Sequence, residues 1–189
     1  MTAAEIIAAI ATAVPGATYQ ALTSADAAVT PAIGVSRESI VATCRALQAP
    51  GLEYVAYSNM TAVDFHPNRS PRFDLVYHLV SPHRRARVRL KVAVEAGESV
   101  ESLTAVFPGA GWCEREVFDL FGIVFDGHAD LRRLMMPEDW DGHPLRKDYP
   151  VQLRKDAQTY MPLQVTEEEF KANMERDRYQ RQTAPAGKK

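Results

Sequence analysis

The sequence is poor in cysteine, and its two cysteines argue against several kinds of site. Cys44 and Cys113 share no Cys-X-X-Cys spacing in the 189-residue chain. Iron–sulfur clusters usually need four cysteine thiolates, and a tetrahedral zinc site with two cysteines needs histidines at matching spacing. We therefore expect no cluster, no structural zinc and no disulfide framework, and we interpret Cys44 as a buried thiol on the apolar side of a helix.

Long apolar runs and an excess of positive charge are also missing. No apolar segment approaches the roughly 20 residues that a membrane helix requires, and the N-terminus has neither the basic start of a secretory signal nor the arginines of a transit peptide. The formal net charge is -2, whereas nucleic-acid-binding proteins usually carry a basic excess. GxGxxG, P-loop and GxSxG motifs are absent, so nucleotide binding and serine-hydrolase chemistry have no sequence support. We expect a cytosol-facing chain.

What the sequence does contain is a regular pattern over residues 1–125. Hydrophobic residues make up 46% of the chain and charged residues 24%, which is ordinary for a globular protein. Apolar spacing and turn residues predict helices at 6–14, 36–47 and 112–121, strands at 18–22, 31–35, 53–65, 72–81 and 84–95, and a loop with a short helix at 97–107. We expect an α+β domain over residues 1–125, with a small mixed or antiparallel sheet and helices packed on one face.

One expected strand carries a row of cations. Between residues 84 and 95, apolar residues at even positions alternate with Arg85, Arg87, Arg89 and Lys91. Such a row suggests nucleic acid at first sight. We favour a half-exposed sheet face or an edge strand guarded by charge.

The helix expected at 112–121 holds charged residues that allow two interpretations. Glu116 and Asp119 lie one turn apart, as paired carboxylates for acid–base catalysis might. Arg115 stands four residues before Asp119, which is the spacing of a routine ion pair on a helix surface. We favour the ion-pair network, and we expect Gly122 to cap the helix.

The pattern changes after residue 125, because residues 126–160 show no sustained period of 2 or 3.6. Asp-Gly-His occurs at 126–128 and again at 141–143, so His128 and His143 could form a metal site with nearby aspartates. Asp-Gly is also a common turn dipeptide, and the neighbouring arginines would repel a cation. We favour turns, and we keep a free-standing metal-dependent enzyme as an alternative.

We interpret residues 126–189 as an extended interface arm, because a long stretch without periodic structure is unusual inside a compact domain. Arginine, tyrosine and tryptophan, which are enriched at interfaces, are frequent in it. Arg146 and Lys147 follow a proline turn and are expected to present rigid cations to a partner, with Tyr149 as an adjoining anchor. Thr166 opens a Thr-Glu-Glu-Glu capping box that predicts a charged helix to about residue 182, followed by a disordered tail.

The segment from Glu114 to Pro150 closely resembles the signature of a known family. The matching elements are ERE at 114–116, DLFG at 119–122, His128, DLRR at 130–133 and GHPLRKDYP at 142–150. They are similar to the 30-kDa subunit of respiratory complex I, the proton-translocating NADH:quinone oxidoreductase. Ala129 departs from the pattern, since the family usually has proline after the histidine.

The resemblance implies a peripheral-arm subunit that lies against the 49-kDa quinone-site subunit. It implies no catalytic residue, metal or cofactor in this chain, with FMN and iron–sulfur clusters held by partner subunits, and a peripheral position at the cytoplasmic face of the cell membrane. Relatives also occur in plastoquinone-reducing complexes and membrane-bound hydrogenases, which stay open as alternatives. The residues expected at the subunit interface are Glu114, Arg115, Glu116, Asp119, His128, Asp130, Arg132, Arg133, Trp140, His143, Arg146, Lys147, Asp148 and Tyr149.

Overall fold

The computed structural model describes residues 1–23, 26, 30–150, 166, 168–169, 171–172 and 174–175. These belong to two compact units, Met1–Tyr149 and Pro150–Lys189. No helix among the described residues is both long and apolar enough to span a bilayer. The first unit contains the described sheets and most of the segment that resembles the family signature.

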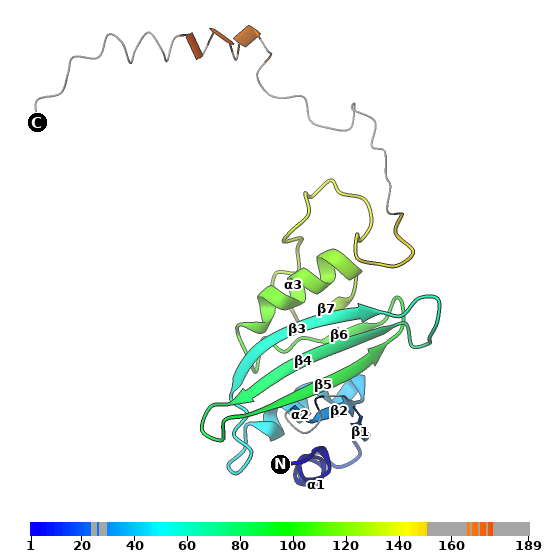
Figure 1. The fold of residues 1–189 in the computed structure, drawn as a ribbon, viewed down its shortest axis with the longest axis vertical. Helices are drawn as coiled ribbons and strands as arrows, with labels where there is room; N and C mark the ends of the chain where they lie inside the picture. The colour runs from blue at the N-terminus through cyan, green and yellow to red at the C-terminus, as the bar shows by residue number, and fades with distance from the viewer. Residues whose placement is uncertain are drawn as a thin grey trace, which may run out of the picture. The chain divides into compact units, whose positions relative to one another are not determined.

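The centre of the first unit is a five-stranded mixed sheet (Figure 1). Its strands lie in the order β1-β2-β5-β4-β3; β2 and β5 run parallel, and the other neighbouring pairs run antiparallel. Two short strands, β6 and β7, form a separate parallel pair. The strand bounds are β1 Tyr19–Leu22, β2 Ala32–Val35, β3 Ala56–Asp64, β4 Phe73–Ser81, β5 Ala86–Val94, β6 Ser99–Glu101 and β7 Val124–Asp126. The predicted small mixed sheet is confirmed.

The helices of this unit pack on one face of the sheet, as predicted. Their bounds are α1 Ala3–Ala13, α2 Ile40–Leu47 and α3 Ala110–Phe121. Ile6 of α1, Cys44 of α2 and Phe121 of α3 belong to a single buried core that also holds Tyr77 of β4. The ring of Phe121 stands edge-on to that of Phe73, which points from β4 to the same side as Tyr77, with centroids 6.5 Å apart. This face therefore carries the hydrophobic core.

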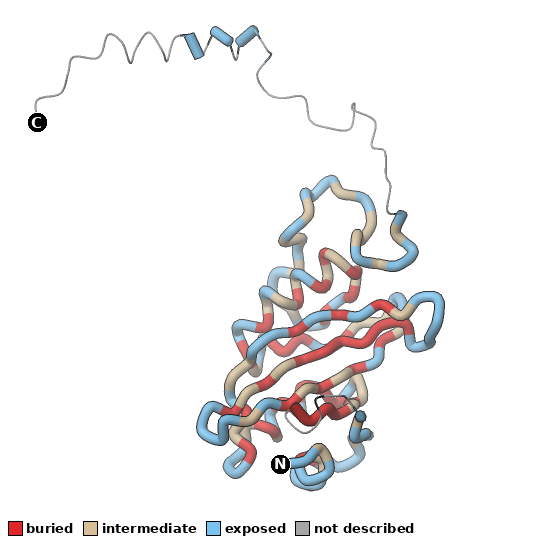
Figure 2. Tube along the Cα trace, in the orientation of Figure 1, coloured by how far each residue is buried: buried red, intermediate tan, exposed pale blue. Residues whose placement is uncertain are grey.

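Strand β5 separates a buried face from a basic one. Val88 and Leu90 are fully buried, whereas Arg87 and Arg89 point to the opposite face of the sheet. Strand β4, by contrast, is buried along most of its length (Figure 2). Because β5 lies between β2 and β4, the edge-strand interpretation of the basic row is wrong, and the half-exposed sheet face is confirmed.

Two local predictions differ from the structure in detail. The residue expected to cap α2, Ser36, instead precedes a 3-10 turn at Arg37–Ser39, and the α-helix begins at Ile40. The loop expected at 97–107 contains strand β6, and turns rather than a helix follow it. Both errors concern short segments that also bond to residues distant in the sequence, since Arg37 donates to the carbonyl of Ser99 and β6 pairs with β7. Gly122 caps α3 with a left-handed φ of 78°, as predicted.

The second unit contains the predicted capping box. The N–H of Thr166 donates to Oε2 of Glu169 at 2.9 Å, and the N–H of Glu169 donates to Oγ1 of Thr166 at 3.2 Å. Residues 168–169, 171–172 and 174–175 are helical. The predicted end of this helix near residue 182 and the predicted disordered tail lie outside the described residues.

Candidate functional site

Residues 127–149, called the signature loop below, belong to the same compact unit as the α+β body. The division therefore falls after Tyr149, further along the chain than the boundary expected after Phe125. No helix or strand occurs between residues 127 and 150, in agreement with the missing periodicity. Because the loop forms no helix or strand, its backbone groups need other partners, which lie in turns of the loop and in the body.

The carboxylate of Asp119, fully buried in α3, is the main anchor of the signature loop. It accepts the N–H groups of Leu134, Met135 and Met136 at 3.0, 2.7 and 2.8 Å. It also accepts Nη1 of Arg133 at 2.7 Å. Burial alone would raise the pKa of Asp119, but these donors outweigh it and lower the pKa below its ordinary value. Asp119 is therefore an ionised hub inside the protein.

Two arginines complete this anchor. Arg133 donates from Nη2 to the carbonyls of Trp140 and Gly142, at 2.9 and 3.1 Å. Arg115 donates to the carbonyls of Arg132 and Arg133, at 3.1 and 3.0 Å. The expected Arg115–Asp119 pair is therefore wrong, because each of the two groups bonds to the signature loop.

His143 lies against the C-terminal end of α3. Its Nδ1 is 2.8 Å from the carbonyl of Asp119, and its ring lies edge-on to that of Phe118, with centroids 6.2 Å apart. The N–H of Leu145 donates to the carbonyl of Leu120 at 3.1 Å. A Cβ on Gly122 would lie only 2.6 Å from the His143 ring, so the glycine makes this close approach possible. The loop thus satisfies carbonyls that the helix leaves without partners.

His128 contacts the N-terminal end of α3. The N–H of Asp130 donates to its Nδ1 at 3.1 Å, so Nε2 carries the proton of the neutral ring and faces the carbonyl of Gly111 at 3.2 Å. Oε2 of the fully buried Glu114 lies 4.0 Å from Nε2. Burial raises the pKa of Glu114, even though its carboxylate accepts the N–H of Leu103 at 2.7 Å.

A separate anchor joins the end of the signature loop to Asp64 of β3 and to Arg72, just before β4. Arg72 makes a two-pronged contact with Asp64, at 2.9 and 2.7 Å, and another with Asp148, at 3.0 and 2.7 Å. The N–H of Lys147 donates to Asp64 at 2.8 Å. Burial opposes ionisation of Asp64, but the hydrogen bonds lower its pKa to about 2. Arg146 pairs with Asp148 at 3.2 Å.

The two Asp-Gly-His segments are turns, as we favoured. Gly127 and Gly142 have left-handed φ angles of 81° and 77°. His128 and His143 contact opposite ends of α3, and no cluster of three or more potential metal-ligating side chains occurs in the described part of the chain. Each histidine is engaged by backbone groups of the protein.

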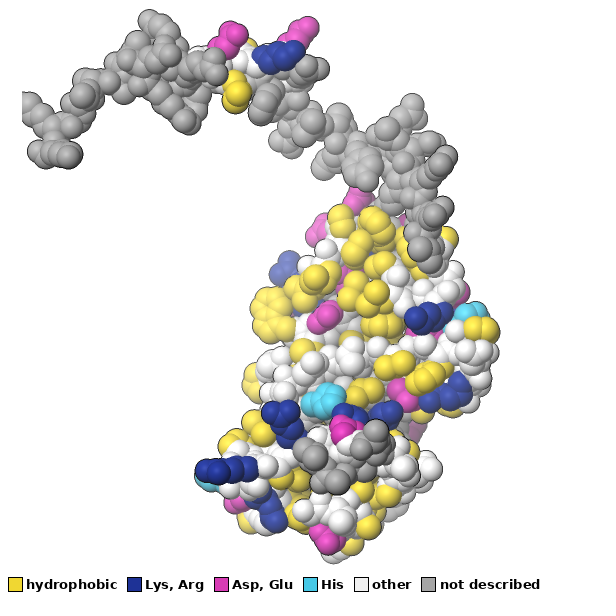
Figure 3. Space-filling model, in the orientation of Figure 1, with side chains coloured by type: hydrophobic (Ala, Val, Ile, Leu, Met, Phe, Trp, Pro, Cys, Tyr) yellow, Lys and Arg dark blue, Asp and Glu magenta, His cyan; other side chains and the backbone are white. Residues whose placement is uncertain are grey.

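The outer surface of this region is apolar and exposed. Trp112 of α3 is 63% exposed, and Met135 and Leu145 of the signature loop are 65% and 51% exposed. Figure 3 shows hydrophobic side chains gathered over α3 and the loop. We call Trp112, Met135 and Leu145 the outer apolar residues. Large side chains held in solvent in this way commonly mark a protein–protein contact.

Residues 33–155 match the family described as respiratory-chain NADH dehydrogenase, 30-kDa subunit. The chain belongs to this family. It is 48% identical over 121 residues to the C subunit of the NADH-quinone oxidoreductase of Geobacter metallireducens, covering 64% of this chain and 74% of that protein. It is 50% identical over 130 residues to the corresponding protein of Roseiflexus castenholzii, covering 68% and 74%.

Two solved structures resemble this member of the 30-kDa subunit family. The trypsin-resistant fragment of Nqo5 is 27% identical, with a TM-score of 0.55, and the match covers 69% of this chain and all of the fragment. A chain of the archaeal membrane-bound sulfane sulfur reductase is 20% identical, with a TM-score of 0.63, and the match covers 84% of this chain and 98% of that one. The second likeness is one of fold. The family expected from residues 114–150 is confirmed.

Two residues that hold the end of the signature loop, Arg72 and Asp64, were not predicted, because they lie far from the signature in the sequence. A signal was present, because Asp64 occupies the inward register of β3 that Met60 and Ala62 also occupy. A charge at such a position requires a buried partner. Of the fourteen residues expected at an interface, Glu114 and Asp119 are fully buried and bonded within the chain. Glu116, Asp130, Arg132, Lys147 and Asp148 are exposed or partly exposed.

Proposed function

We propose that the chain is a non-catalytic component of an NADH:quinone oxidoreductase and docks on the 49-kDa quinone-site subunit. The contact is made by the outer apolar residues and the exposed charged residues of the signature loop. The flavin and the iron–sulfur clusters are held by partner subunits, and the chain lies peripherally at the cytoplasmic face. The relatives, which are named as subunits of NADH-quinone oxidoreductase, support its place in such a complex.

The observation that carries this proposal is that the buried polar side chains at the signature loop bond to groups within the chain. The carboxylate of Asp119 accepts from four donors, and both terminal nitrogens of Arg133 donate to acceptors within the chain. A general acid or base needs a free position for substrate and a pKa near the working pH. Asp119 has neither, since its carboxylate is enclosed and its pKa is lowered. We therefore assign Asp119 and Arg133 to holding the signature loop, and with it the docking surface, in place.

The cysteines also support the assignment of cofactors to partner subunits. Burial raises the pKa of Cys44 to about 12, so it stays a protonated thiol at neutral pH. Metal ligation requires the thiolate. Cys113, on α3, stands without a second cysteine near it in the sequence. The cysteines of this chain are therefore poor ligands for an iron–sulfur cluster.

The proposed interface divides the predicted residues into two groups. Glu114, Asp119, Arg133 and His143 position the loop from inside the protein. Exposed residues such as Arg132, whose side chain is 68% exposed, make the contact itself. Loss of an anchor should therefore disturb docking indirectly, through the shape of the loop.

The test is the double variant Met135→Asp and Leu145→Asp in the cell that makes the complex. Both side chains are exposed, so the free chain should fold normally, while charges buried at the interface should abolish docking. We expect loss of assembled complex on native gels and normal quinone reduction for each complex that does assemble. Val55→Asp, at a 48% exposed position just before β3, is the matched control. Normal assembly with failed turnover would contradict the proposal.

A further inference from the structure

The face of the sheet opposite the helices carries a concentration of positive charge that docking of the signature loop does not use. We call it the open face. Strand β5 places Arg87, Arg89 and Lys91 on it, and Arg84 and Arg85 lie in the turn between β4 and β5. Figure 3 shows dark-blue side chains gathered over this part of the surface. The chain as a whole has a formal net charge of -2, so this row is a local excess of positive charge.

Few of these cations are neutralised within the described part of the protein. Arg89 pairs with Asp26 at 2.9 Å, and Lys91 lies 3.9 Å from Asp74. Arg84, Arg85 and Arg87 form no ion pair with any residue that the structure describes. Arginine is the cation preferred at protein interfaces, because its planar fork matches a carboxylate and it loses hydration easily. The open face therefore has unused capacity for carboxylates.

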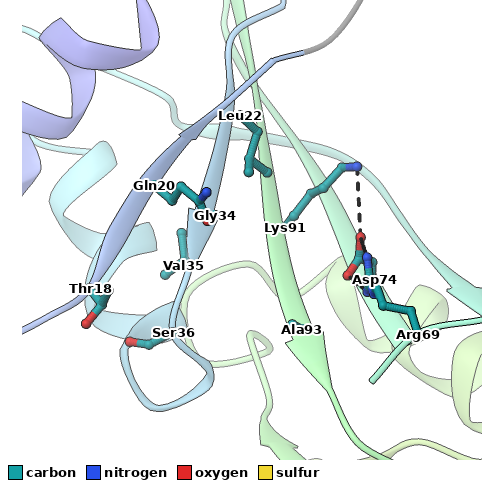
Figure 4. Close-up of a pocket in the computed structure, with 10 residues that line it drawn as sticks. All are labelled: Thr18, Gln20, Leu22, Gly34, Val35, Ser36, Arg69, Asp74, Lys91 and Ala93. Atoms are coloured by element: carbon teal, nitrogen blue, oxygen red, sulfur yellow. Dashed lines mark hydrogen bonds and ion pairs between the residues drawn. The ribbon is translucent and has the colours of Figure 1, made fainter. Parts of the chain in front are cut away.

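A shallow groove continues this basic row beyond Lys91 (Figure 4). Its volume is about 330 Å³. It is lined by Gly34 of β2, Ala93 of β5, and Gln20 and Leu22 of β1, with Lys91, Arg69 and the carboxylate of Asp74 along the other side. The groove thus joins small residues to the end of a line of cations.

Neither backbone nor packing explains the glycine in this groove. Gly34 lies inside a strand that is paired on both sides, and its φ is outside the left-handed region. A Cβ added to it would meet Gln20 Cβ at 3.5 Å, which is an ordinary contact. Glycine weakens a strand, and in such a position it often marks the close approach of another backbone. A side chain here would fill the groove.

We infer that the open face binds an acidic, extended segment of a partner polypeptide, which runs along β5 and ends in the groove. Side chains on one side of β5 repeat about every 6.6 Å, which matches carboxylates at alternate positions of an extended chain. An extended segment also needs a narrower groove than a helix, which is about 10 Å across. A lipid-binding surface would need large exposed apolar side chains to insert into the bilayer, and the outward face of β5 carries arginine and lysine instead. This inference does not depend on docking by the signature loop.

The first test measures binding of a fluorescent alternating glutamate–serine peptide to the full chain by anisotropy. The double charge reversal Arg87→Glu and Arg89→Glu should weaken binding by about tenfold or more, because each close charge pair contributes on that scale. Gly34→Val, which fills the groove, should weaken it to a smaller extent. Arg45→Glu reverses an exposed arginine of α2 on the helix side and should leave affinity unchanged.

Two outcomes of this test overturn the inference. Peptide affinity that is unchanged by the double reversal would show that the open face does not select carboxylates. Binding to phosphatidylglycerol–phosphatidylcholine vesicles, lost on the double reversal in the absence of peptide binding, would assign the face to lipid. A glutamine–serine peptide is the control for charge.

The second test uses the assembled complex and a zero-length carbodiimide, which joins a lysine amine to a carboxylate in contact with it. A product formed by Lys91 reports a contact of the open face, and a product formed by Lys147 reports a contact of the signature loop. The two inferences are therefore tested separately. We expect Lys91 to be joined to an aspartate or glutamate of another chain in the complex, and to Asp74 in the isolated protein. Lys91→Arg should remove this product and keep that of Lys147. An interchain product from Lys147 with none from Lys91 would overturn the inference and leave the proposed docking intact.

Discussion

The α+β body and the signature loop of this protein are held in place by different forces. The body buries aliphatic and aromatic side chains from every strand of its main sheet except β1, whose Tyr19 is partly buried, and from its helices. In the loop, Leu131 is the hydrophobic residue that packs against this core. The loop is held instead by Asp119, Arg133 and Arg72, whose charges are buried or nearly so. A segment without periodicity can thus be ordered by a few ionised groups.

The two regions should tolerate change differently. An apolar core accepts substitutions that conserve volume, because dispersion and burial are not directional. A buried carboxylate with four donors is directional, and removal of any member leaves others unpaired in a low dielectric. The following substitutions separate the two, in descending order of effect.

Asp119→Ala should have the largest effect, and it should be local. It leaves the Arg133 guanidinium and three backbone N–H groups without their acceptor, which typically costs about 3–5 kcal/mol for a broken buried pair. We expect limited trypsin digestion to cleave after Arg132 and Arg133 in the variant and to leave the body whole. Equal loss of protection in loop and body would contradict the separation of the two regions. Asp119→Asn keeps an accepting oxygen, so its loss of loop protection should lie between that of the wild type and that of Asp119→Ala.

Leu90→Ala should destabilise the body and the loop together, by about 3 kcal/mol. Leu90 is fully buried on the helix-covered face of β5, so its loss opens a cavity in the common core. Chemical denaturation should show one cooperative transition at a lower midpoint, with trypsin sites of the loop exposed only as the whole unit unfolds. Selective release of the loop would show that the core, too, acts locally.

Asp64→Asn should remove about 2 kcal/mol near neutral pH, and the loss should depend on pH. The pKa of Asp64 is about 2 in the folded protein, below its ordinary value of 3.8. Its carboxylate therefore stabilises the fold fully above about pH 4, and this stabilisation is lost as the pH falls toward 2. Stability measured against pH should show the wild type and the variant converging in that range. A constant difference would show that Arg72 does not act through the ionised carboxylate.

Gly122→Ala and Gly34→Ala compare a glycine required by the loop with one not required by the fold. At Gly122 the left-handed φ and the ring of His143 both oppose a Cβ, so we expect a loss of about 1–2 kcal/mol. At Gly34 an alanine meets its neighbours only at ordinary contact distances, 3.5 Å or more, and should change stability by less than about 0.5 kcal/mol. Thermal unfolding of both variants checks the pair. Equal losses would mean that the approach of His143 is not the reason for the glycine.

Residues close in sequence predicted much of the fold. The alternation at 84–95 indicated a two-faced strand, and Gly122 indicated the end of α3. The run from Glu114 to Pro150 indicated the family, because it combines several ordered motifs. Short elements were harder, as β6 shows: its three residues carry too little pattern to be distinguished from a loop, and their strand partner lies at 124–126.

The sequence by itself therefore determined the family, the sheet with its helices on one face, and the turn character of the two Asp-Gly-His segments. These follow from local spacing, from backbone preferences of glycine, and from ordered motifs. Only the tertiary structure decided which charges meet. Asp119 bonds to Arg133 instead of Arg115, which is nearer in the sequence. Asp148 bonds to Arg72, just before β4, although 76 positions separate them in the sequence. The reason is physical: many pairings of opposite charges suit the same sequence, and the packed core selects those that bring donors and acceptors together away from water.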